Sequence, residues 1–355
     1  MKPGVLFTGG AGYIGSHTIY QFCEKEEYQD YDIVVIDNYA NSNDENLNQI
    51  KIKFNRPIHL YLFDLCDPFL LTGIFRKHSI QCIIHFAGLK AVGESNEIPL
   101  KYYQNNLNST LNLLEYAKLH SVSNFIFSSS ATVYGDPQYL PIDEKHSLQS
   151  TNPYGRTKWM IEEILKDEFH SPSNKMNIVI LRYFNPVSCH PSGLLKENPK
   201  GRPNNLFPLI SHVYQGIRSE VSVFGNDYPT KDGTGVRDYI HVVDLAEAHL
   251  KSFQFLQNAP KVNFLGYASD IQNETQKPIL KIYNVGTGNG FSVLEMIQMF
   301  QEVSQKDIPH SIQPRRQGDV AQCYADSKLI QEETGWKPFY NLEDMVSHEI
   351  NRLSK

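Results

Sequence analysis

Tyr154 and Lys158 stand four residues apart and could together perform acid–base chemistry. The preceding Asn152 and Pro153 predict that a helix starts here, with asparagine as the N-cap and proline at the first helical position. Positions i and i+4 share one face of a helix, so the phenol and the ammonium should lie close together. A nearby cation stabilises a phenolate and lowers the pKa of the phenol, which gives a base that works near neutral pH.

A run of serines, Ser128–Ser130, ends an apolar stretch that predicts a buried strand. The carboxyl ends of parallel strands are the place where open α/β sheets bind ligands. Ser130 could therefore hydrogen-bond a reacting hydroxyl group and relay its proton to Tyr154. Serine, tyrosine and lysine together predict a site that interconverts an alcohol and a ketone.

A glycine-rich turn, with Gly9, Gly12 and Gly15, follows the first apolar segment and precedes a predicted helix. Gly9 permits the tight turn, Gly12 lets the backbone approach a pyrophosphate, and Gly15 permits close packing of helix on strand. Asp37 ends the next predicted strand, at the spacing that the dinucleotide fingerprint requires. Its carboxylate would accept hydrogen bonds from the adenosine ribose and repel a 2′-phosphate. The cofactor predicted is NAD rather than NADP.

These residues require a framework of alternating strands and helices. Nearly continuous apolar segments predict strands at 5–8, 33–37, 60–65, 82–87, 125–129 and 178–183, and helices are predicted between them at 15–27, 70–77, 102–120 and 153–169. This alternation is typical of the α/β class with a doubly wound parallel (Rossmann) sheet. We expect an NAD-binding domain at 1–186.

The amino-acid composition changes beyond about residue 185, where glycine, proline and asparagine are frequent. We expect a smaller α/β domain at 187–355, with helices at 207–216, 244–256, 293–302 and 342–351, and some of its elements could fold back onto the first sheet. Ser292 and Glu295 form a capping-box pattern. Residues 257–278 are polar and lack periodicity, which predicts an inserted surface loop.

The bulk properties exclude several classes of function. A formal net charge of −6 over 355 residues predicts no general affinity for nucleic acid or for an anionic membrane. The five cysteines form no C-x-x-C pair, which argues against a disulfide framework or a zinc knuckle, and we expect no metal site. No signal sequence or membrane-spanning run is evident, so a cytoplasmic protein is expected.

Longer segments carry a family resemblance. The glycine loop, the segment SSSATVYG at 128–135 and the Tyr154–Lys158 pair resemble the extended short-chain dehydrogenase/reductases. Within that family, HFAGLKAVGES at 85–95, RYFNP at 182–186 and GTGVRDYIHV at 233–242 are similar to the UDP-glucose 4-epimerases. The resemblance covers nearly the whole chain.

The resemblance implies a set of binding residues. Those expected at the NAD site are Gly9, Gly12, Tyr13, Ile14, Gly15, Asp37, Asn38, Asp64, Leu65, Phe86, Ala87, Gly88, Lys90, Asn105, Ser130, Tyr154, Lys158 and Phe184. Those expected at the UDP-sugar site, for which the domain at 187–355 would provide most contacts, are Ser130, Tyr154, Asn185, Asn205, Arg237, Arg316, Asp319 and Cys323. Arginine forks suit a diphosphate. A homodimer through paired helices of the first domain is also implied.

The resemblance further implies a reaction mechanism and a role in galactose metabolism. Tyr154 would take the proton of the C4 hydroxyl, with Ser130 bridging, while hydride passes to a retained NAD. The 4-keto sugar would turn over and receive the hydride on its other face, which interconverts UDP-glucose and UDP-galactose. Cys323 lies where family members border the sugar pocket and some carry tyrosine. Its small side chain would leave room for a 2-acetamido group, so UDP-GlcNAc and UDP-GalNAc are expected substrates too.

Three alternatives use the same motifs. A nucleotide-sugar 4,6-dehydratase would place Asp-Glu beside the active serine, whereas this chain has Ser129, Ser130 and Ala131. A non-catalytic NAD-binding sensor would typically lose the tyrosine or the lysine, and both are present. The motifs alone also permit a dehydrogenase that releases NADH. Retention of NAD during purification distinguishes this last alternative from an epimerase.

Overall fold

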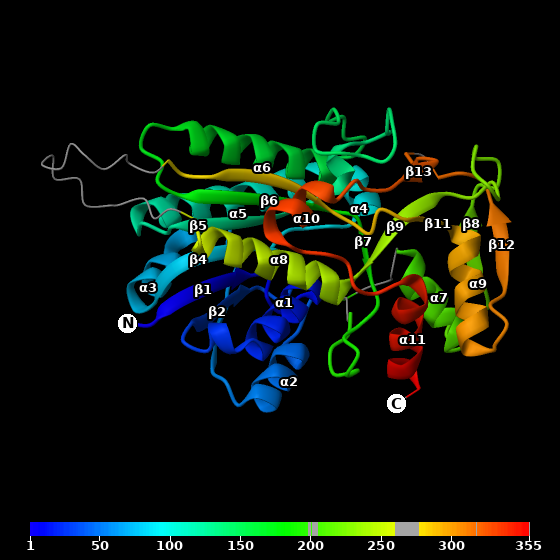
Figure 1. The fold of residues 1–355 in the computed structure, drawn as a ribbon, viewed down its shortest axis with the longest axis horizontal. Coiled ribbons are helices and arrows are strands. Elements are labelled where there is room, and N and C mark those ends of the chain that lie inside the picture. Colours follow the sequence, from blue (N-terminus) through cyan, green and yellow to red (C-terminus); the bar gives the residue numbers. More distant parts are fainter. Residues whose placement is uncertain (198–199, 201–204, 260–276, 317, 355) are drawn as a thin grey trace, which may run out of the picture.

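The structure, a computed structural model, describes residues 1–354 apart from 198–199, 201–204, 260–276 and 317 (Figure 1). A parallel sheet of seven strands lies at its centre, in the order β10-β6-β5-β4-β1-β2-β3. The strands are β1 (Pro3–Thr8), β2 (Asp32–Asp37), β3 (Ile58–Leu62), β4 (Ser79–His85), β5 (Asn124–Ser130), β6 (Asn177–Tyr183) and β10 (Leu280–Val285). The predicted doubly wound parallel sheet is confirmed, and each of its six predicted strands is present with ends shifted by a few residues.

Helices cover both faces of this sheet (Figure 1). One face carries α1 (Tyr13–Glu24), α2 (Glu45–Phe54), α8 (Val242–Gln257) and α10 (Lys328–Thr334), and the other carries α3 (Leu71–Lys77), α5 (Pro99–Leu119) and α6 (Pro153–His170). A short helix, α4 (Val92–Glu97), precedes α5. The strands are apolar on both sides because each side is buried by a helical layer. None of the helices in the described ranges is long and apolar enough to cross a bilayer.

The remaining elements pack at the carboxyl edge of the sheet. A small sheet joins β7 (Asn185–Val187), β9 (Val236–His241), β11 (Gly290–Ser292) and β13 (Gln322–Cys323), and β8 (Val221–Phe224) pairs with β12 (His310–Gln313). The helices α7 (Leu206–Tyr214), α9 (Val293–Ser304) and α11 (Leu342–Leu353) share a separate apolar core with them. The predicted capping box is confirmed: the Ser292 hydroxyl accepts from the Glu295 N–H group at 3.0 Å.

Three helices and one strand of the central layers were not predicted. They are α2, α4, α10 and β10, and β10 extends the sheet beside β6. Both β10 and α8 lie beyond residue 186 in the chain yet belong to the first sheet and its cover. The division into units at residue 186 stays a prediction. Most of the expected loop at 257–278 lies outside the described residues.

Candidate active site

Tyr154 is fixed by the way α6 begins. The Asn152 side-chain oxygen accepts from the Gly155 N–H group at 2.9 Å, which confirms the predicted N-cap, and Pro153 occupies the first helical position. A Cβ atom at Gly155 would lie 2.7 Å from the Thr132 carbonyl oxygen, so only glycine lets this turn approach the end of β5. Tyr154 is consequently buried at the carboxyl edge of the sheet.

Ser130 and Tyr183 are the polar side chains that act most strongly on the Tyr154 hydroxyl group. Burial, and then the neighbouring Tyr183, raise the pKa of Tyr154 well above its usual value, while Ser130 opposes this shift. The sequence predicted a lowered pKa for this phenol. In the protein by itself the opposite holds, because desolvation of the phenolate is the largest effect.

Lys158 is buried one turn further along α6. Its Nζ atom donates to the Ser128 carbonyl oxygen at 2.8 Å and lies 4.7 Å from the centre of the Phe127 ring. Burial lowers the pKa of Lys158 to about 7, and the negative charge of Glu162 opposes that shift. The ammonium is thus near its midpoint of titration at neutral pH. Its hydrogen bond is made to strand β5, not to the Tyr154 hydroxyl group.

The three serines that end β5 have different partners. Ser128 Oγ lies 3.2 Å from His249 Nε2, and Ser129 Oγ donates to Glu162 at 2.5 Å. Ser130 Oγ accepts from the Thr132 N–H group at 3.2 Å, and Ser130 is the serine that acts on the pKa of Tyr154. The period of two in a strand explains the difference, since Ser129 points to the opposite face from its neighbours.

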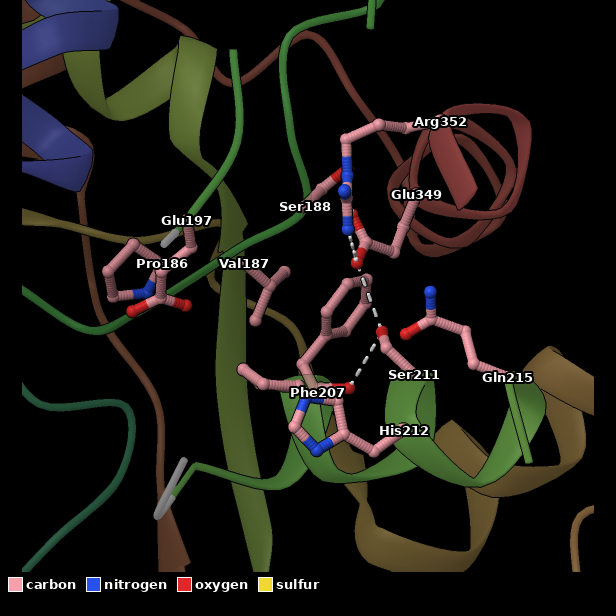
Figure 2. Close-up of a pocket in the computed structure, with 11 residues that line it drawn as sticks. Pro186, Val187, Ser188, Glu197, Phe207, Ser211, His212, Gln215, Glu349 and Arg352 are labelled. Atoms are coloured by element: carbon pink, nitrogen blue, oxygen red, sulfur yellow. Dashed lines mark hydrogen bonds and ion pairs between the residues drawn. The ribbon is translucent and has the colours of Figure 1, made fainter. Parts of the chain in front are cut away.

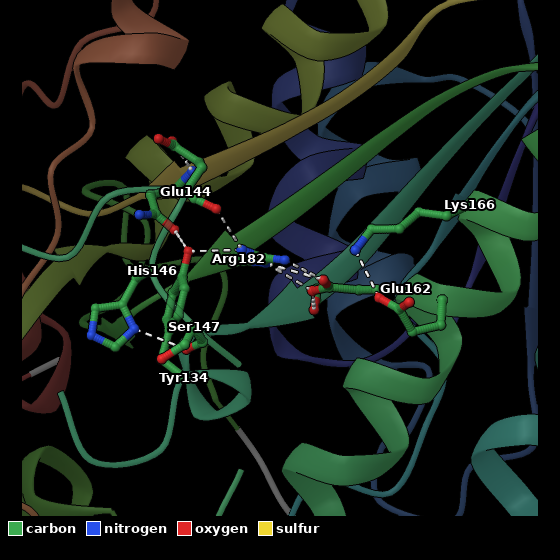
Figure 3. A network of polar contacts seen from close by, with 10 residues as sticks. Tyr134, Glu144, His146, Ser147, Glu162, Lys166 and Arg182 are labelled. Atoms are coloured by element: carbon green, nitrogen blue, oxygen red, sulfur yellow. Dashed lines mark hydrogen bonds and ion pairs between the residues drawn. The ribbon is translucent and has the colours of Figure 1, made fainter. Parts of the chain in front are cut away.

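Arg182 and Glu162 form a buried ion pair (Figure 3). Arg182 on β6 donates to Glu162 on α6 through Nη2 at 2.6 Å and Nε at 3.1 Å, and neither side chain is more than 2% exposed. Arg182 Nη1 also donates to the Tyr134 hydroxyl at 3.0 Å, which donates to Asn284 on β10 at 2.6 Å. The network joins α6 to two strands. Sequence reasoning missed Glu162, although its i+4 spacing from Lys158 was a usable signal.

The glycine loop forms a cradle at the start of α1. Gly9 has φ of +67°, and a Cβ atom there would lie 2.7 Å from the Ala87 backbone nitrogen. A Cβ at Gly15 would lie 2.6 Å from the Gly9 carbonyl oxygen. Asp37 braces the loop by accepting from the Ala11 N–H group at 3.0 Å. This close-packed turn at the start of a helix fits a dinucleotide pyrophosphate.

Other residues predicted for the cofactor gather around the same edge. Asn38 Nδ2 donates to Asp64 Oδ2 at 3.1 Å, so these two predicted residues meet, and Leu65 beside them is buried. The Tyr13 hydroxyl group, also predicted for the cofactor, donates instead to the Ser188 carbonyl oxygen at 2.5 Å. Ile14, Phe86 and Ala87 are half-buried and pack against the core, while Gly88 adopts φ of +154°.

Asn106 is a positioning residue that sequence reasoning missed. The predicted Asn105 donates to Asn106 Oδ1 at 3.0 Å. The buried Asn106 side chain also accepts from the Leu89 N–H group at 2.8 Å and donates to Thr157 Oγ1 at 2.9 Å. It therefore fastens the segment after β4 to the helical turn that carries Tyr154. In that segment Lys90 is half-exposed and forms an ion pair with Glu197 at 3.1 Å.

The residues predicted for the sugar nucleotide lie on the smaller sheet and its loops. Cys323 pairs with Arg237 across β13 and β9, and it packs on a buried cluster that includes Ala131 and Phe184. Burial raises the pKa of Cys323 to about 11, so it is a neutral thiol. The cluster places Cys323 next to the strand end that carries Ser130.

The other sugar-nucleotide candidates are more exposed. Arg316 Nε donates to Asp319 at 3.0 Å, and its guanidinium lies 4.6 Å from the centre of the Phe224 ring. Asn185 starts β7 and Asn205 occupies the N-cap position of α7, and both are exposed. The structure brings Arg237 to Cys323 and Arg316 to Asp319, without a described contact between the two pairs.

A small cavity of about 80 Å³ lies between β7, α7 and α11 (Figure 2). Ser211 Oγ donates to Glu349 at 3.1 Å, and Glu349 accepts from Arg352 at 2.6 Å on its wall. No residue predicted for the cofactor or the sugar nucleotide lines this cavity among the described residues. It is therefore distinct from the group around Tyr154.

Tyr154, Lys158 and Ser130 converge at the carboxyl edge of a parallel sheet whose first turn is shaped for a dinucleotide. This combination places the chain among the extended short-chain dehydrogenase/reductases. Comparison with known proteins specifies the group further. The family described as GDP-mannose 4,6 dehydratase matches residues 6–348. The UDP-glucose 4-epimerase of Bacillus subtilis (strain 168) is 48% identical over 343 residues, which cover 97% of this chain and 94% of that protein.

Solved structures agree with this assignment. The crystal structure of UDP-glucose 4-epimerase from Bifidobacterium longum in complex with NAD+ and UDP has a TM-score of 0.88 and 45% identity, covering 99% of this chain and 98% of that one. The UDP-Glc/GlcNAc 4-epimerase of Campylobacter jejuni has a TM-score of 0.79 and 34% identity, covering 99% of both chains. The chain belongs to the UDP-glucose 4-epimerase family, within the broader dehydratase-type family.

Proposed function

We propose that this protein is an NAD-dependent isomerase that interconverts UDP-glucose and UDP-galactose by oxidation and reduction at C4 of the hexose. The observation that carries the proposal is the buried Tyr154 side chain at the carboxyl edge of the sheet, next to Ser130, which acts on the pKa of its hydroxyl group. Burial excludes water from the reacting hydroxyl group, and two hydroxyl groups in series provide a path for one proton.

The cofactor would be held by residues of the first sheet. The loop Gly9–Gly15 would receive the pyrophosphate at the start of α1, and Asp37 would receive the ribose. When bound, NAD accepts a hydride from the sugar and returns it, and its oxidised nicotinamide carries a positive charge. A retained cofactor is expected because no net oxidation occurs in the reaction.

The protein's own residues would move the proton. Ser130 would contact the C4 hydroxyl group and relay its proton to Tyr154, or Tyr154 would accept it directly. Lys158 would favour the phenolate through its positive charge, which is partly retained at neutral pH because its pKa is about 7. The high pKa of Tyr154 in the protein alone means that an added positive charge is required before it acts as a base.

The sugar nucleotide would be held from the smaller sheet. Arg237 and Arg316 would bind the diphosphate, with Asn185, Asn205 and Asp319 as further polar contacts. Cys323 packs beside Ala131 and Phe184, and its small side chain supports acceptance of a 2-acetamido group, so UDP-GlcNAc and UDP-GalNAc are proposed as further substrates. In this proposal residues 187–355 supply most sugar-nucleotide contacts and residues 1–186 most NAD contacts.

The test is to give the purified protein UDP-galactose with no added NAD and to follow UDP-glucose, and then to repeat the assay with UDP-GalNAc. Conversion of both substrates supports the epimerase and the roomy pocket. A Cys323→Tyr variant should then lose the N-acetylated reaction and keep the other. Conversion of UDP-galactose alone would refute the argument from Cys323. No conversion by a protein with bound NAD would refute the epimerase.

A 4,6-dehydratase is the second candidate, favoured by the description of the matching family. The residues at the end of β5 argue against a dehydratase. The Asp-Glu pair that would eliminate water is expected beside Ser130, but Ser129 and Ala131 flank it, and the Ser129 hydroxyl group donates to Glu162. A 4-keto-6-deoxy product from UDP-glucose would establish the dehydratase instead.

We also propose a cytoplasmic homodimer formed through α5 and α6. These helices pack on the same face of the sheet (Figure 1) and expose Leu100, Leu111 and Met160. Such an apolar face is typical of an interface. Light scattering on the purified protein measures the oligomeric state, and a monomer at assay concentration would refute this part of the proposal.

A further inference from the structure

Three potential metal ligands meet at the amino-terminal edge of the central sheet, opposite to the edge that carries Tyr154. Asp32 is the first residue of β2, His59 is near the start of β3, and His78 directly precedes β4. One ligand atom from each side chain lies within 4.8 Å of the other two. We propose that Asp32, His59 and His78 form a zinc-binding site that joins these strands.

The backbone brings the ligands together across an intervening strand. Asp32 and His59 lie on the neighbouring strands β2 and β3, whereas β1 separates β2 from β4. At the crossing point β1 has Gly4, where an added Cβ atom would lie 3.2 Å from Ile80 Cδ1 and 3.8 Å from Asp32 Cβ. Because Gly4 has no side chain, Asp32 on β2 and the start of β4 at Ser79 and Ile80 come close together across β1.

The distances are close to those of a bound ion. His78 Nδ1 lies 3.9 Å from Asp32 Oδ2. A tetrahedral zinc with bonds of about 2.0–2.2 Å places its ligand atoms about 3.4 Å apart. This pair would therefore close by roughly half an ångström, and the pairs with His59, each within 4.8 Å, by at most about 1.4 Å. The His59 and His78 rings are 4.7 Å apart between centres. Asp32 is 30% exposed and His59 is half-buried, so water can reach the site and complete the coordination.

A hydrogen bond with Tyr61 fixes the orientation of the His78 ring. Tyr61 Oη lies 2.8 Å from His78 Nε2, so Nδ1 is the nitrogen left toward Asp32. A metal-bound imidazole typically has its second nitrogen held by such a partner. His78 is buried, which keeps this orientation. The tyrosine hydroxyl therefore acts as a positioning group for the proposed site.

The ligand set favours zinc over harder cations. Two imidazoles and one carboxylate suit Zn²⁺, whereas Ca²⁺ and Mg²⁺ prefer several oxygen ligands. The sequence predicted no metal site, because its ligands come from three separate segments and only the sheet brings them together.

Zinc here would stabilise the fold without entering the reaction. An ion that binds the folded chain alone raises the stability by mass action. The test uses the NAD-bound protein after chelator treatment, titrated with Zn²⁺ in competition with a chromophoric chelator. We expect one equivalent per chain that raises the melting temperature, while Mg²⁺ has no effect. Co²⁺ should give visible absorption typical of a four-coordinate site.

Variants make the assignment specific. His59→Ala should lose this equivalent and the cobalt spectrum, whereas His310→Ala, on an exposed residue of β12, should keep both. Tyr61→Phe should weaken binding by about 10–100-fold, since it removes the outer partner. Epimerase activity should be unchanged in all three variants. Equal zinc binding by wild type and His59→Ala would overturn the proposal, and so would unchanged affinity in Tyr61→Phe.

Discussion

The Glu162–Arg182 pair offers a quantitative test of how the site is supported. Glu162 is fully buried and accepts from Arg182 and from Ser129, so its replacement by glutamine keeps the shape and removes the charge. The Arg182 guanidinium would then be buried without a counter-charge. Breaking one partner of a buried pair typically costs about 3–5 kcal/mol. We expect Glu162→Gln to lower the free energy of unfolding by that amount.

The neighbouring residue on α6 supplies a matched control. Glu163 forms an ion pair with Lys166 at 2.7 Å, but its side chain is 53% exposed. Glu163→Gln makes the same chemical change at the surface, where such pairs contribute about 0–1 kcal/mol. The assay is urea unfolding of the protein saturated with NAD. Equal losses in the two variants would refute the reasoning from burial.

A double variant separates the lost charge pair from lost packing. Glu162→Met combined with Arg182→Met removes both charges and leaves no unpaired ion. We expect it to lose less stability than Glu162→Gln, because paired replacement of buried ions is often nearly neutral. The hydrogen bond from Arg182 to Tyr134 is also lost, at a cost of about 1 kcal/mol. A double variant less stable than the single one would show that packing dominates.

Three further predictions concern the reaction, the loop and the pH response. Tyr154→Phe should lower kcat by about 10²–10⁴-fold with NAD still bound, whereas Tyr139→Phe, on an exposed tyrosine, should leave kcat unchanged. Asn106→Leu leaves the Leu89 N–H group unpaired, so it should lose NAD during gel filtration and about 1–3 kcal/mol of stability, while Asn108→Leu on the exposed face of α5 should do neither. Burial lowers the pKa of His17 and of His85 to about 3, below the value in the unfolded chain. Their contribution to stability is complete above about pH 6.5 and falls as the pH drops toward 3, by about 2 kcal/mol per histidine at pH 5; a flat profile of urea midpoints over this range would contradict it.

Much of the fold could be predicted because buried parallel strands and their helices leave a local record. Val34 and Val35 are both fully buried on opposite faces of β2, and such apolar runs mark a strand wherever they occur. The start of α6 could also be predicted from a local signal, because Asn152 and Pro153 are typical of an N-cap and a first helical position. The segment Leu280–Val285 carries a similar signal, but it follows a long polar stretch. Its place beside β6 depends on a partner about a hundred residues earlier, which no local pattern records.

The candidate site divides in the same way. Residue types at fixed offsets were enough to identify the chemical groups, which are the glycine loop, Asp37, Ser130, Tyr154 and Lys158. The pKa values of these groups depend on the packing around them. Burial raises the pKa of Tyr154 and lowers that of Lys158, and desolvation depends on what packs around a group in three dimensions. Partners distant in sequence, such as Arg182 for Glu162, are likewise chosen by the sheet, so their roles follow from the fold alone.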